Sequence, residues 1–185
     1  MENRKKRWDT KNMVLMAFFA GVTCVLAPLS VPIGPVPISL TNLVIYFSIF
    51  ILGWQRATIT YLVYLLIGMA GLPVFSGFES GVGKFVGPTG GYLVGFILMT
   101  IVSGLFIQIR VEKTWLRKVL SFTGMVVGTT IAYAFGTVWF CFSTGSGIWA
   151  ALLICVFPFV IGDIVKMVLA IAVAPVITAR IQKIT

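Results

Sequence analysis

Long apolar segments, interrupted by short polar or glycine-rich connections, run along almost the whole chain. The apolar residues are continuous and do not alternate with polar ones, which favours α-helices over the strands of a barrel. Because about 20 apolar residues span a bilayer as a helix, each long run is a candidate transmembrane helix. Six such segments cover residues 12–28, 39–53, 57–70, 89–109, 119–141 and 149–178. We therefore predict an all-α integral membrane protein with six transmembrane helices in a single domain, residues 1–185.

Proline and glycine set the ends of these segments. Pro28 ends the first helix, and Pro32, Pro35 and Pro37 predict that the chain after it stays extended. The run Thr-Gly-Ser-Gly at 144–147 separates the fifth helix from the sixth. The sixth segment is longer than one span needs, so we expect it to be tilted, or kinked at Pro158.

Composition agrees with a membrane protein and excludes several classes of function. Of the 185 residues, 59% are hydrophobic and 10% are charged, and the mean hydropathy is +1.06. A soluble core of this size cannot bury so much apolar surface. The three cysteines form no CxxC pair and histidine is absent. We therefore expect no disulfide framework, no metal site and no histidine-based catalysis, and no arrangement of nucleophile and base points to an enzyme.

The basic residues predict the orientation of the helices. The net charge is +9, and alternating six helices puts 12 of the 14 basic side chains at one end. The positive-inside rule makes that end cytoplasmic, with both termini inside. The loops 29–38, 71–88 and 142–148 then lie outside, where Lys84 is the only basic residue. The charge thus reflects topology and contact with anionic lipid, and we expect no nucleic-acid partner.

The basic run before the first apolar segment also resembles the start of a signal peptide. It contains Arg4, Lys5, Lys6 and Arg7. No small-residue cleavage site closes the apolar run that follows, and more predicted helices come after it. We interpret the apolar run as a first helix that is retained in the protein.

Residues 71–91 are the part of the chain least compatible with a regular helix. Seven of these 21 residues are glycine and two are proline. An irregular outer loop between membrane helices is a place where a small ligand can be gripped and released. The aromatic residues around it either form apolar walls for a ligand or simply pack the loop; they are Phe75, Phe78, Phe85 and Tyr92.

The end of this loop superficially resembles a phosphate-binding loop, because Gly83 is followed by Lys84. The spacing back to Gly77 is one residue too long, and Phe85 stands where Ser or Thr would bind magnesium. We therefore expect no ATP site and no cofactor in this chain.

Asp163 and Lys166 are the two charged residues inside the predicted membrane segments. They are three residues apart, so they lie on one face of a helix. Each alone would cost about 2.5–3.5 kcal/mol at the centre of a bilayer, so an ion pair that faces the bundle interior is expected. Three interpretations remain: a structural ion pair that holds the last helix, a polar site for a ligand, and a proton relay.

The first segment contains a small-xxx-small pattern, Ala17 to Gly21. Small residues at this spacing let two helices approach closely. The pattern serves either packing inside the chain or contact with a partner subunit.

Four motifs follow one another along the chain: Pro-Val-Pro-Ile-Ser-Leu at 35–40, Gly-Leu-Pro-Val-Phe at 71–75, Gly-Pro-Thr-Gly-Gly-Tyr-Leu-Val-Gly-Phe at 87–96 and Gly-Asp-Ile-Val-Lys at 162–166. Together they resemble the BioY family, the biotin-specific substrate-binding subunits of energy-coupling factor (ECF) transporters. The resemblance covers nearly the whole chain, in order and spacing. It implies a six-helix subunit in a bacterial or archaeal cell membrane that takes biotin from outside. It also implies a transmembrane coupling subunit and two cytoplasmic ATPases as partners.

The resemblance also implies roles for individual residues. It assigns biotin contacts to Asp163 and Lys166, a lid to 71–88 and coupling-subunit contacts to Ala17 and Gly21. Departures from the family pattern occur at Thr41, where Gln is frequent, and at Phe78, Glu79, Ser80 and Lys84 in the lid. One hypothesis pairs Lys84 with the valerate carboxylate of biotin and Glu79 with its ureido N–H groups. The candidate substrate contacts are Asp163, Lys166, Glu79, Phe78, Lys84, Tyr92 and Thr41.

A second functional hypothesis is a stand-alone importer coupled to protons through Asp163. No inverted repeat of the Asp163–Lys166 pair is visible in the sequence, which does not favour this hypothesis.

Overall fold

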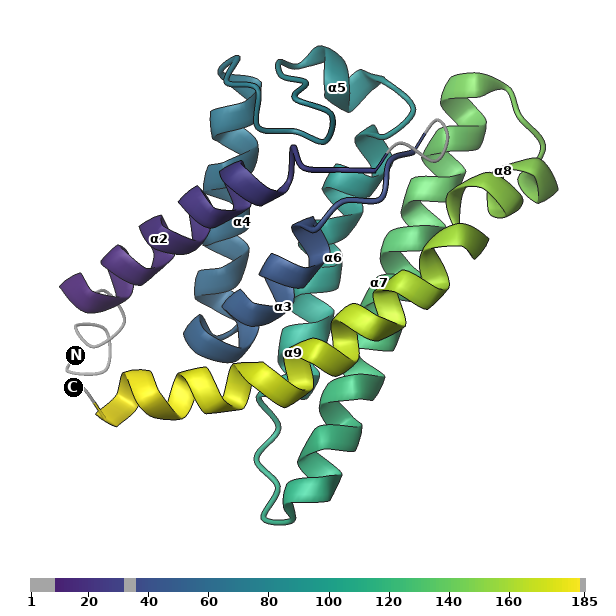
Figure 1. Cartoon of the computed structure of the whole chain (residues 1–185). Helices are drawn as coiled ribbons and strands as arrows, with labels where there is room; N and C mark the ends of the chain where they lie inside the picture. Colours follow the sequence, from purple (N-terminus) through teal and green to yellow (C-terminus); the bar gives the residue numbers. More distant parts are fainter. Residues whose placement is uncertain (1–8, 32–35, 184–185) are drawn as a thin grey trace, which may run out of the picture.

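The computed structural model describes residues 9–31 and 36–183, and this part of the chain folds into helices (Figure 1). Two isolated β-bridges, Val31 with Ile38 and Phe75 with Glu79, lie between them. The all-α prediction is confirmed. The basic run Arg4–Arg7, Pro32 and Pro35 lie outside the described residues. The helices are α2 (Thr10–Leu26), α3 (Thr41–Leu52), α4 (Trp54–Met69), α5 (Gly83–Val86), α6 (Gly90–Ile107), α7 (Thr114–Thr144), α8 (Ile148–Cys155) and α9 (Phe157–Lys183).

Three stretches are long and apolar enough to cross a membrane, by length and composition, in the described part of the chain. They are Gly90–Ile107, Thr114–Thr144 and Ile148–Ile181, the last of which joins α8 and α9. α2 and α3 are apolar but shorter. At a rise of 1.5 Å per residue, α3 covers about 18 Å, less than the roughly 30 Å hydrocarbon core. The count of six membrane crossings therefore stays a prediction.

The last apolar segment is interrupted rather than bent at Pro158. α8 ends at Cys155, and Val156 leaves helical geometry with φ −125° and ψ −59° before α9 begins. Pro158 then lies in the first turn of α9, where a missing N–H breaks no helical hydrogen bond. The proline inside the helix is Pro175.

The loop predicted at 71–88 contains one regular element, the single turn α5. The rest of the loop is anchored by Phe75, which is fully buried and packs edge-on against Tyr64 and Phe85, with ring centroids 5.7 and 5.8 Å away. Gly68 makes room for the Phe75 ring, because a side chain there would overlap it. Hydrogen bonds hold the loop as well: Gly81 N–H donates to the Gly68 carbonyl at 2.8 Å, and the Tyr64 hydroxyl donates to the Val74 carbonyl at 3.1 Å.

Helices α6 and α7 form the most extensive pairing in the bundle. Glycine makes this close approach possible: a Cβ on Gly95 would lie 3.1 Å from the backbone of Ala132 on α7. α9 packs on α3 and crosses in front of α3 and α6 in Figure 1, while α2 packs on α3 and α4.

The connections gather at two opposite ends of the bundle. In Figure 1 the segment with α5, the chain entering α3 and the α7–α8 connection lie at the upper end. The α6–α7 connection lies at the lower end, and the start of α2 and the end of α9 lie on the same side of the bundle. The glycine-rich loop therefore lies at the same end as the chain entering α3 and the α7–α8 connection.

Candidate ligand-binding site

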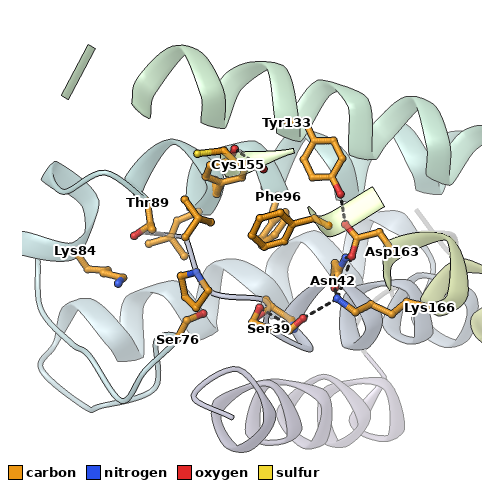
Figure 2. Close-up of a pocket in the computed structure, with 16 residues that line it drawn as sticks. Ser39, Asn42, Ser76, Lys84, Thr89, Phe96, Tyr133, Cys155, Asp163 and Lys166 are labelled. Carbon is orange, nitrogen blue, oxygen red and sulfur yellow. Dashed lines mark hydrogen bonds and ion pairs between the residues drawn. The ribbon is translucent and has the colours of Figure 1, made fainter. Parts of the chain in front are cut away.

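A cavity of about 60 Å³ lies under the loop 71–88 and extends down between α3, α6, α7 and α9 (Figure 2). It is lined by polar residues at both ends and mainly by apolar residues between. The lining residues are Val36, Pro37, Ser39, Thr41, Asn42, Ser76, Lys84, Thr89, Tyr92, Leu93, Phe96, Tyr133, Cys155, Phe159, Asp163 and Lys166.

At its inner end the cavity meets a buried ion pair. The Lys166 Nζ lies 3.0 Å from Asp163 Oδ1, and the two residues are 9% and 5% exposed. Both lie on the buried face of α9, while Ile161 and Val165 point outward. Asp163 and Lys166 therefore form the ion pair predicted from their spacing, and the pair faces the interior of the bundle.

Asn42 on α3 completes this pair. Its Nδ2 donates to Asp163 Oδ1 at 2.7 Å, and its Oδ1 accepts from Lys166 Nζ at 3.0 Å. One amide thus satisfies an acid and a base at the same time, which only a side chain with both a donor and an acceptor can do. Asn42 is itself buried, with 4% of its surface exposed.

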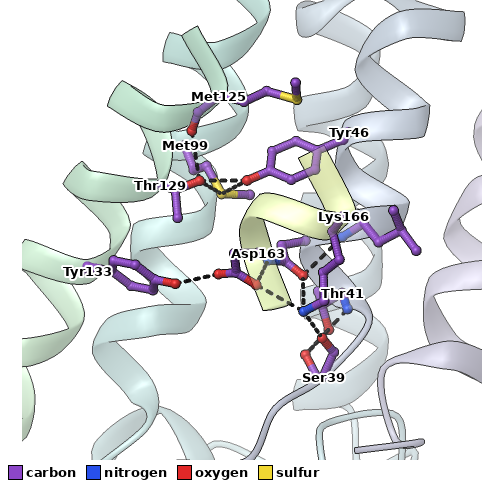
Figure 3. Close-up of polar contacts among 11 residues, drawn as sticks. Ser39, Thr41, Tyr46, Met99, Met125, Thr129, Tyr133, Asp163 and Lys166 are labelled. Atoms are coloured by element: carbon purple, nitrogen blue, oxygen red, sulfur yellow. Dashed lines mark hydrogen bonds and ion pairs between the residues drawn. The ribbon is translucent and has the colours of Figure 1, made fainter. Parts of the chain in front are cut away.

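Two further groups fix the charged pair in place (Figure 3). The Tyr133 hydroxyl on α7 donates to Asp163 Oδ2 at 2.5 Å, and Lys166 Nζ donates to the Ser39 carbonyl at 2.8 Å. All three protons of the Lys166 ammonium are therefore engaged, by Ser39, Asn42 and Asp163. The Asp163 carboxylate can accept a hydrogen bond from another donor, and Asn42 keeps one amide N–H without a hydrogen-bond acceptor among the described residues.

The other end of the cavity is formed by the loop and the start of α6. Figure 2 shows Lys84, Thr89 and Ser76 at this end, opposite Asp163 and Lys166. The Lys84 side chain is 11% exposed and lies 2.7 Å from the carboxylate of Glu79, which is 58% exposed. Thr89 has a buried hydroxyl without a hydrogen-bond partner among the described residues. This end therefore offers a cation and an unused hydroxyl.

Apolar walls join the two polar ends. Phe96 and Leu93 come from α6 and Phe159 comes from α9. Tyr92 adds its ring, while its hydroxyl turns away and donates to the carbonyl of Cys155 at 3.2 Å. The cavity thus suits an elongated ligand that is polar at both ends and apolar in the middle.

The predicted contact residues divide into two groups. Asp163, Lys166, Lys84, Tyr92 and Thr41 line the cavity. Phe78 and Glu79 are not among the residues that line it. Phe78 has a positive φ of 60° and is 63% exposed. The Glu79 side chain is mostly exposed and reaches Lys84 from outside the cavity. The structure therefore does not bring Glu79 to the polar inner end, so nothing in it supports the proposed contact with ureido N–H groups.

Sequence reasoning missed several cavity residues, and three of them carry polar groups that matter for the site: Asn42, Tyr133 and Thr89. The signal for Asn42 was an amide near the start of an apolar helix, where a buried amide must find a partner. For Tyr133 and Thr89 no local signal exists, because hydroxyls are common in such helices. Among the described residues there is no group of three His, Cys, Asp or Glu side chains that could hold a metal ion.

The proposed partner contacts lie elsewhere. Ala17 and Gly21 are exposed on the outer face of α2 and line a shallow groove with Phe18, Val22, Val25 and Leu26. A Cβ on Gly21 would meet no atom of this chain within 4 Å. The small-xxx-small pattern is therefore not used for packing inside the described structure.

The sequence profile of the BioY family matches residues 1–183. The chain belongs to the BioY family. It is 34% identical to the biotin transporter BioY of Thermotoga maritima, over 94% of this chain and 97% of that protein. It is 32% identical to the probable biotin transporter BioY of Pyrococcus horikoshii, over 89% of this chain and 94% of that protein.

A solved structure shares the fold. The crystal structure of the S-component for biotin from an ECF-type ABC transporter superposes with a TM-score of 0.79 and 27% identity, covering 99% of this chain and 95% of that one. As a BioY protein with several apolar helices, the chain is a multi-pass membrane transport protein and not an enzyme. The family resemblance read from the sequence motifs is confirmed.

Proposed function

We propose that this chain captures biotin from outside the cell and is the substrate-binding subunit of an ATP-driven ECF importer in the plasma membrane. The observation that carries the proposal is the cavity with the Asp163–Lys166–Asn42 cluster at one end and Lys84 at the other. Biotin has the matching form: a ureido ring, an apolar thiophane and alkyl chain, and a carboxylate at the far end. The names of the relatives described above support the same ligand.

The inner end suits the ureido group. A ureido ring has two N–H donors and one carbonyl acceptor. Asp163 has remaining acceptor capacity for a ureido N–H, and Asn42 has a remaining N–H for the carbonyl. The ion pair can stay intact while the ligand binds, so a preorganised cluster loses little entropy on binding.

The outer end suits the carboxylate. Lys84 lines the cavity and pairs with Glu79. A ligand carboxylate would replace Glu79 as the ion-pair partner of the Lys84 ammonium and would also accept a hydrogen bond from the Thr89 hydroxyl. This exchange replaces an exposed carboxylate by one shielded from water, where the attraction is stronger. Glu79 thus acts as a placeholder for the ligand and makes no contact with the ureido ring.

Entry of the ligand requires the loop to move. Ser76 and Lys84 of the loop line the outer part of the cavity, so a ligand that enters from the loop side has to pass them. Gly71, Gly77 and Gly81 have positive φ values of 104°, 78° and 84°, which glycine adopts without strain. We propose that the loop swings open around these glycines and closes over bound biotin.

Release into the cytoplasm needs partners in this proposal. The exposed face of α2 with Ala17 and Gly21 is the contact for the coupling subunit, and two ATPases supply the energy. Uptake of labelled biotin by cells should then require the partner subunits. Uptake by this chain alone that stops with a protonophore would favour the proton-coupled alternative instead.

The Lys84 contact gives the sharpest binding test. Lys84→Ala should weaken biotin roughly 10- to 100-fold, the contribution of a charge-assisted hydrogen bond, and biotin amide much less. Glu79→Gln is the matched control, because it removes the other half of the ion pair but no cavity wall, and it should bind biotin at least as tightly as the unmodified chain. Equal losses for biotin and its amide in Lys84→Ala would refute the assignment, and failure to retain any biotin on purification would refute the ligand.

A further inference from the structure

Another cavity opens at the end of the bundle opposite the loop 71–88. It has a volume of about 810 Å³ and lies between the end of α3, the α6–α7 connection, the start of α7 and the C-terminal part of α9. We call it the basic cavity, because three arginines and no acidic residue line it. Its polar lining consists of Arg56, Gln108, Arg110, Arg117, Ser121 and Thr178.

Two of the arginines are available for a ligand. Arg110 and Arg117 are exposed, and neither forms an ion pair or a side-chain hydrogen bond among the described residues. Glu112 is in the same connection but does not line the cavity. Three guanidinium groups around one space repel each other unless an anion lies between them.

The local helix end does not oppose an anion. The last carbonyls of α3 would present partial negative charge to the cavity. Arg56 donates to the Leu52 carbonyl at 3.5 Å, which partly satisfies it. The full positive charges of the three arginines outweigh the partial negative charge of the remaining carbonyls.

An apolar extension connects the basic cavity to the membrane-facing side of α9. A smaller cavity of about 190 Å³ shares Phe50, Arg117, Ser121 and Pro175 with it. The extension adds Lys118 and the apolar residues Ile171, Ala172 and Val176 of α9. A soluble anion gains nothing from contact with these apolar residues, whereas the acyl chain of a lipid can pack against them.

We infer that the basic cavity binds the phosphate headgroup of an anionic phospholipid, with one acyl chain along α9. Arginine suits this ligand, because its planar group donates two parallel hydrogen bonds to phosphate oxygens. The predicted orientation puts this end in the cytoplasmic leaflet, where anionic lipids are abundant. This lipid site does not depend on which ligand binds in the cavity under the loop 71–88.

The test compares lipid retention by two double variants of equal charge. The full chain is purified in detergent, given equal amounts of phosphatidylglycerol and phosphatidylcholine, and examined by native mass spectrometry. The test variant is Arg110→Gln with Arg117→Gln. The control is Lys113→Gln with Arg180→Gln, which removes two charges from the same end but from no residue that lines either cavity. A thermal unfolding midpoint equal to that of the unmodified chain checks that both variants are folded.

If the arginines form a specific site, the preference for phosphatidylglycerol falls at least about tenfold in the test variant, since one charge-assisted hydrogen bond contributes that much. The preference stays unchanged in the control. No preference in the unmodified chain, or equal loss in both variants, would overturn the inference, because a diffuse surface charge would then suffice. A third arm adds glycerol phosphate: displacement of the lipid by millimolar amounts would identify a soluble phosphate as the ligand and reject the lipid.

Discussion

Replacing Asn42 by alanine tests the inner end of the proposed biotin cavity most directly. Asn42 bridges Asp163 and Lys166 from a different helix, with distances of 2.7 and 3.0 Å. The substitution removes both contacts, and it also removes the unused amide N–H proposed for the ureido carbonyl. The ion pair itself and the contacts from Tyr133 and Ser39 remain.

The magnitudes follow from these contacts. A hydrogen bond to a charged group contributes about 1.5–3 kcal/mol, so two lost bonds would lower the free energy of unfolding by roughly 3 kcal/mol or more. The loss stays near the lower figure if water enters the space left by the amide. Loss of the ligand contact alone, at about 1.5–3 kcal/mol, weakens biotin roughly 10- to 100-fold.

Calorimetric titration with biotin and thermal unfolding without ligand measure the two effects separately. Ser48→Ala is the matched control: Ser48 is also buried on α3 and donates to the Ile45 carbonyl at 2.7 Å, but it does not line the cavity. It should leave the affinity for biotin unchanged. An Asn42→Ala protein that is folded and binds biotin as tightly as the unmodified chain would show that the cluster is a structural lock and that the ligand binds elsewhere.

Two further predictions concern Thr89, whose hydroxyl has no hydrogen-bond partner among the described residues, and Gly21, which is exposed on α2. Thr89→Val removes a buried hydroxyl that has no hydrogen bond among the described residues, so thermal stability should not fall while biotin binds roughly tenfold more weakly; lower stability with unchanged affinity in the same two assays would contradict the role at the carboxylate end. Gly21→Leu adds a side chain on the exposed face of α2, where its Cβ has no atom of another described segment within 4 Å, so biotin binding by the purified chain should persist while uptake with the partner subunits falls severalfold or more. Uptake equal to that of the unmodified protein would remove α2 as the coupling contact.

Much of the helical layout was open to sequence reasoning. Each apolar run is read from residues that are close in the chain, and the breaks at proline and glycine are local as well. The same holds for Asp163 and Lys166, whose spacing of three residues places them on one helix face wherever that helix packs. The break at Val156 was not predicted at its position, because Pro158 fits the first turn of a new helix as readily as it kinks an old one.

The loop shows where local reasoning ended. Its glycine content predicted an irregular backbone, but the directions of its side chains depend on that backbone in detail. Phe78, with a φ of 60°, lies outside, whereas Phe75, three residues earlier, is completely buried against Tyr64. Glu79 and Lys84 both carry charge, yet only Lys84 lines the cavity.

The amino-acid sequence by itself determined the helical membrane architecture, the family and the charged pair, because these depend on periodicity, composition and short spacing. The tertiary structure alone decided how the pair is completed. Asn42 meets Asp163 across 121 residues of chain, and Tyr133 meets it across 30. Such contacts exist only once α3, α7 and α9 have packed together, since a buried polar group takes whichever partner the packing brings within reach.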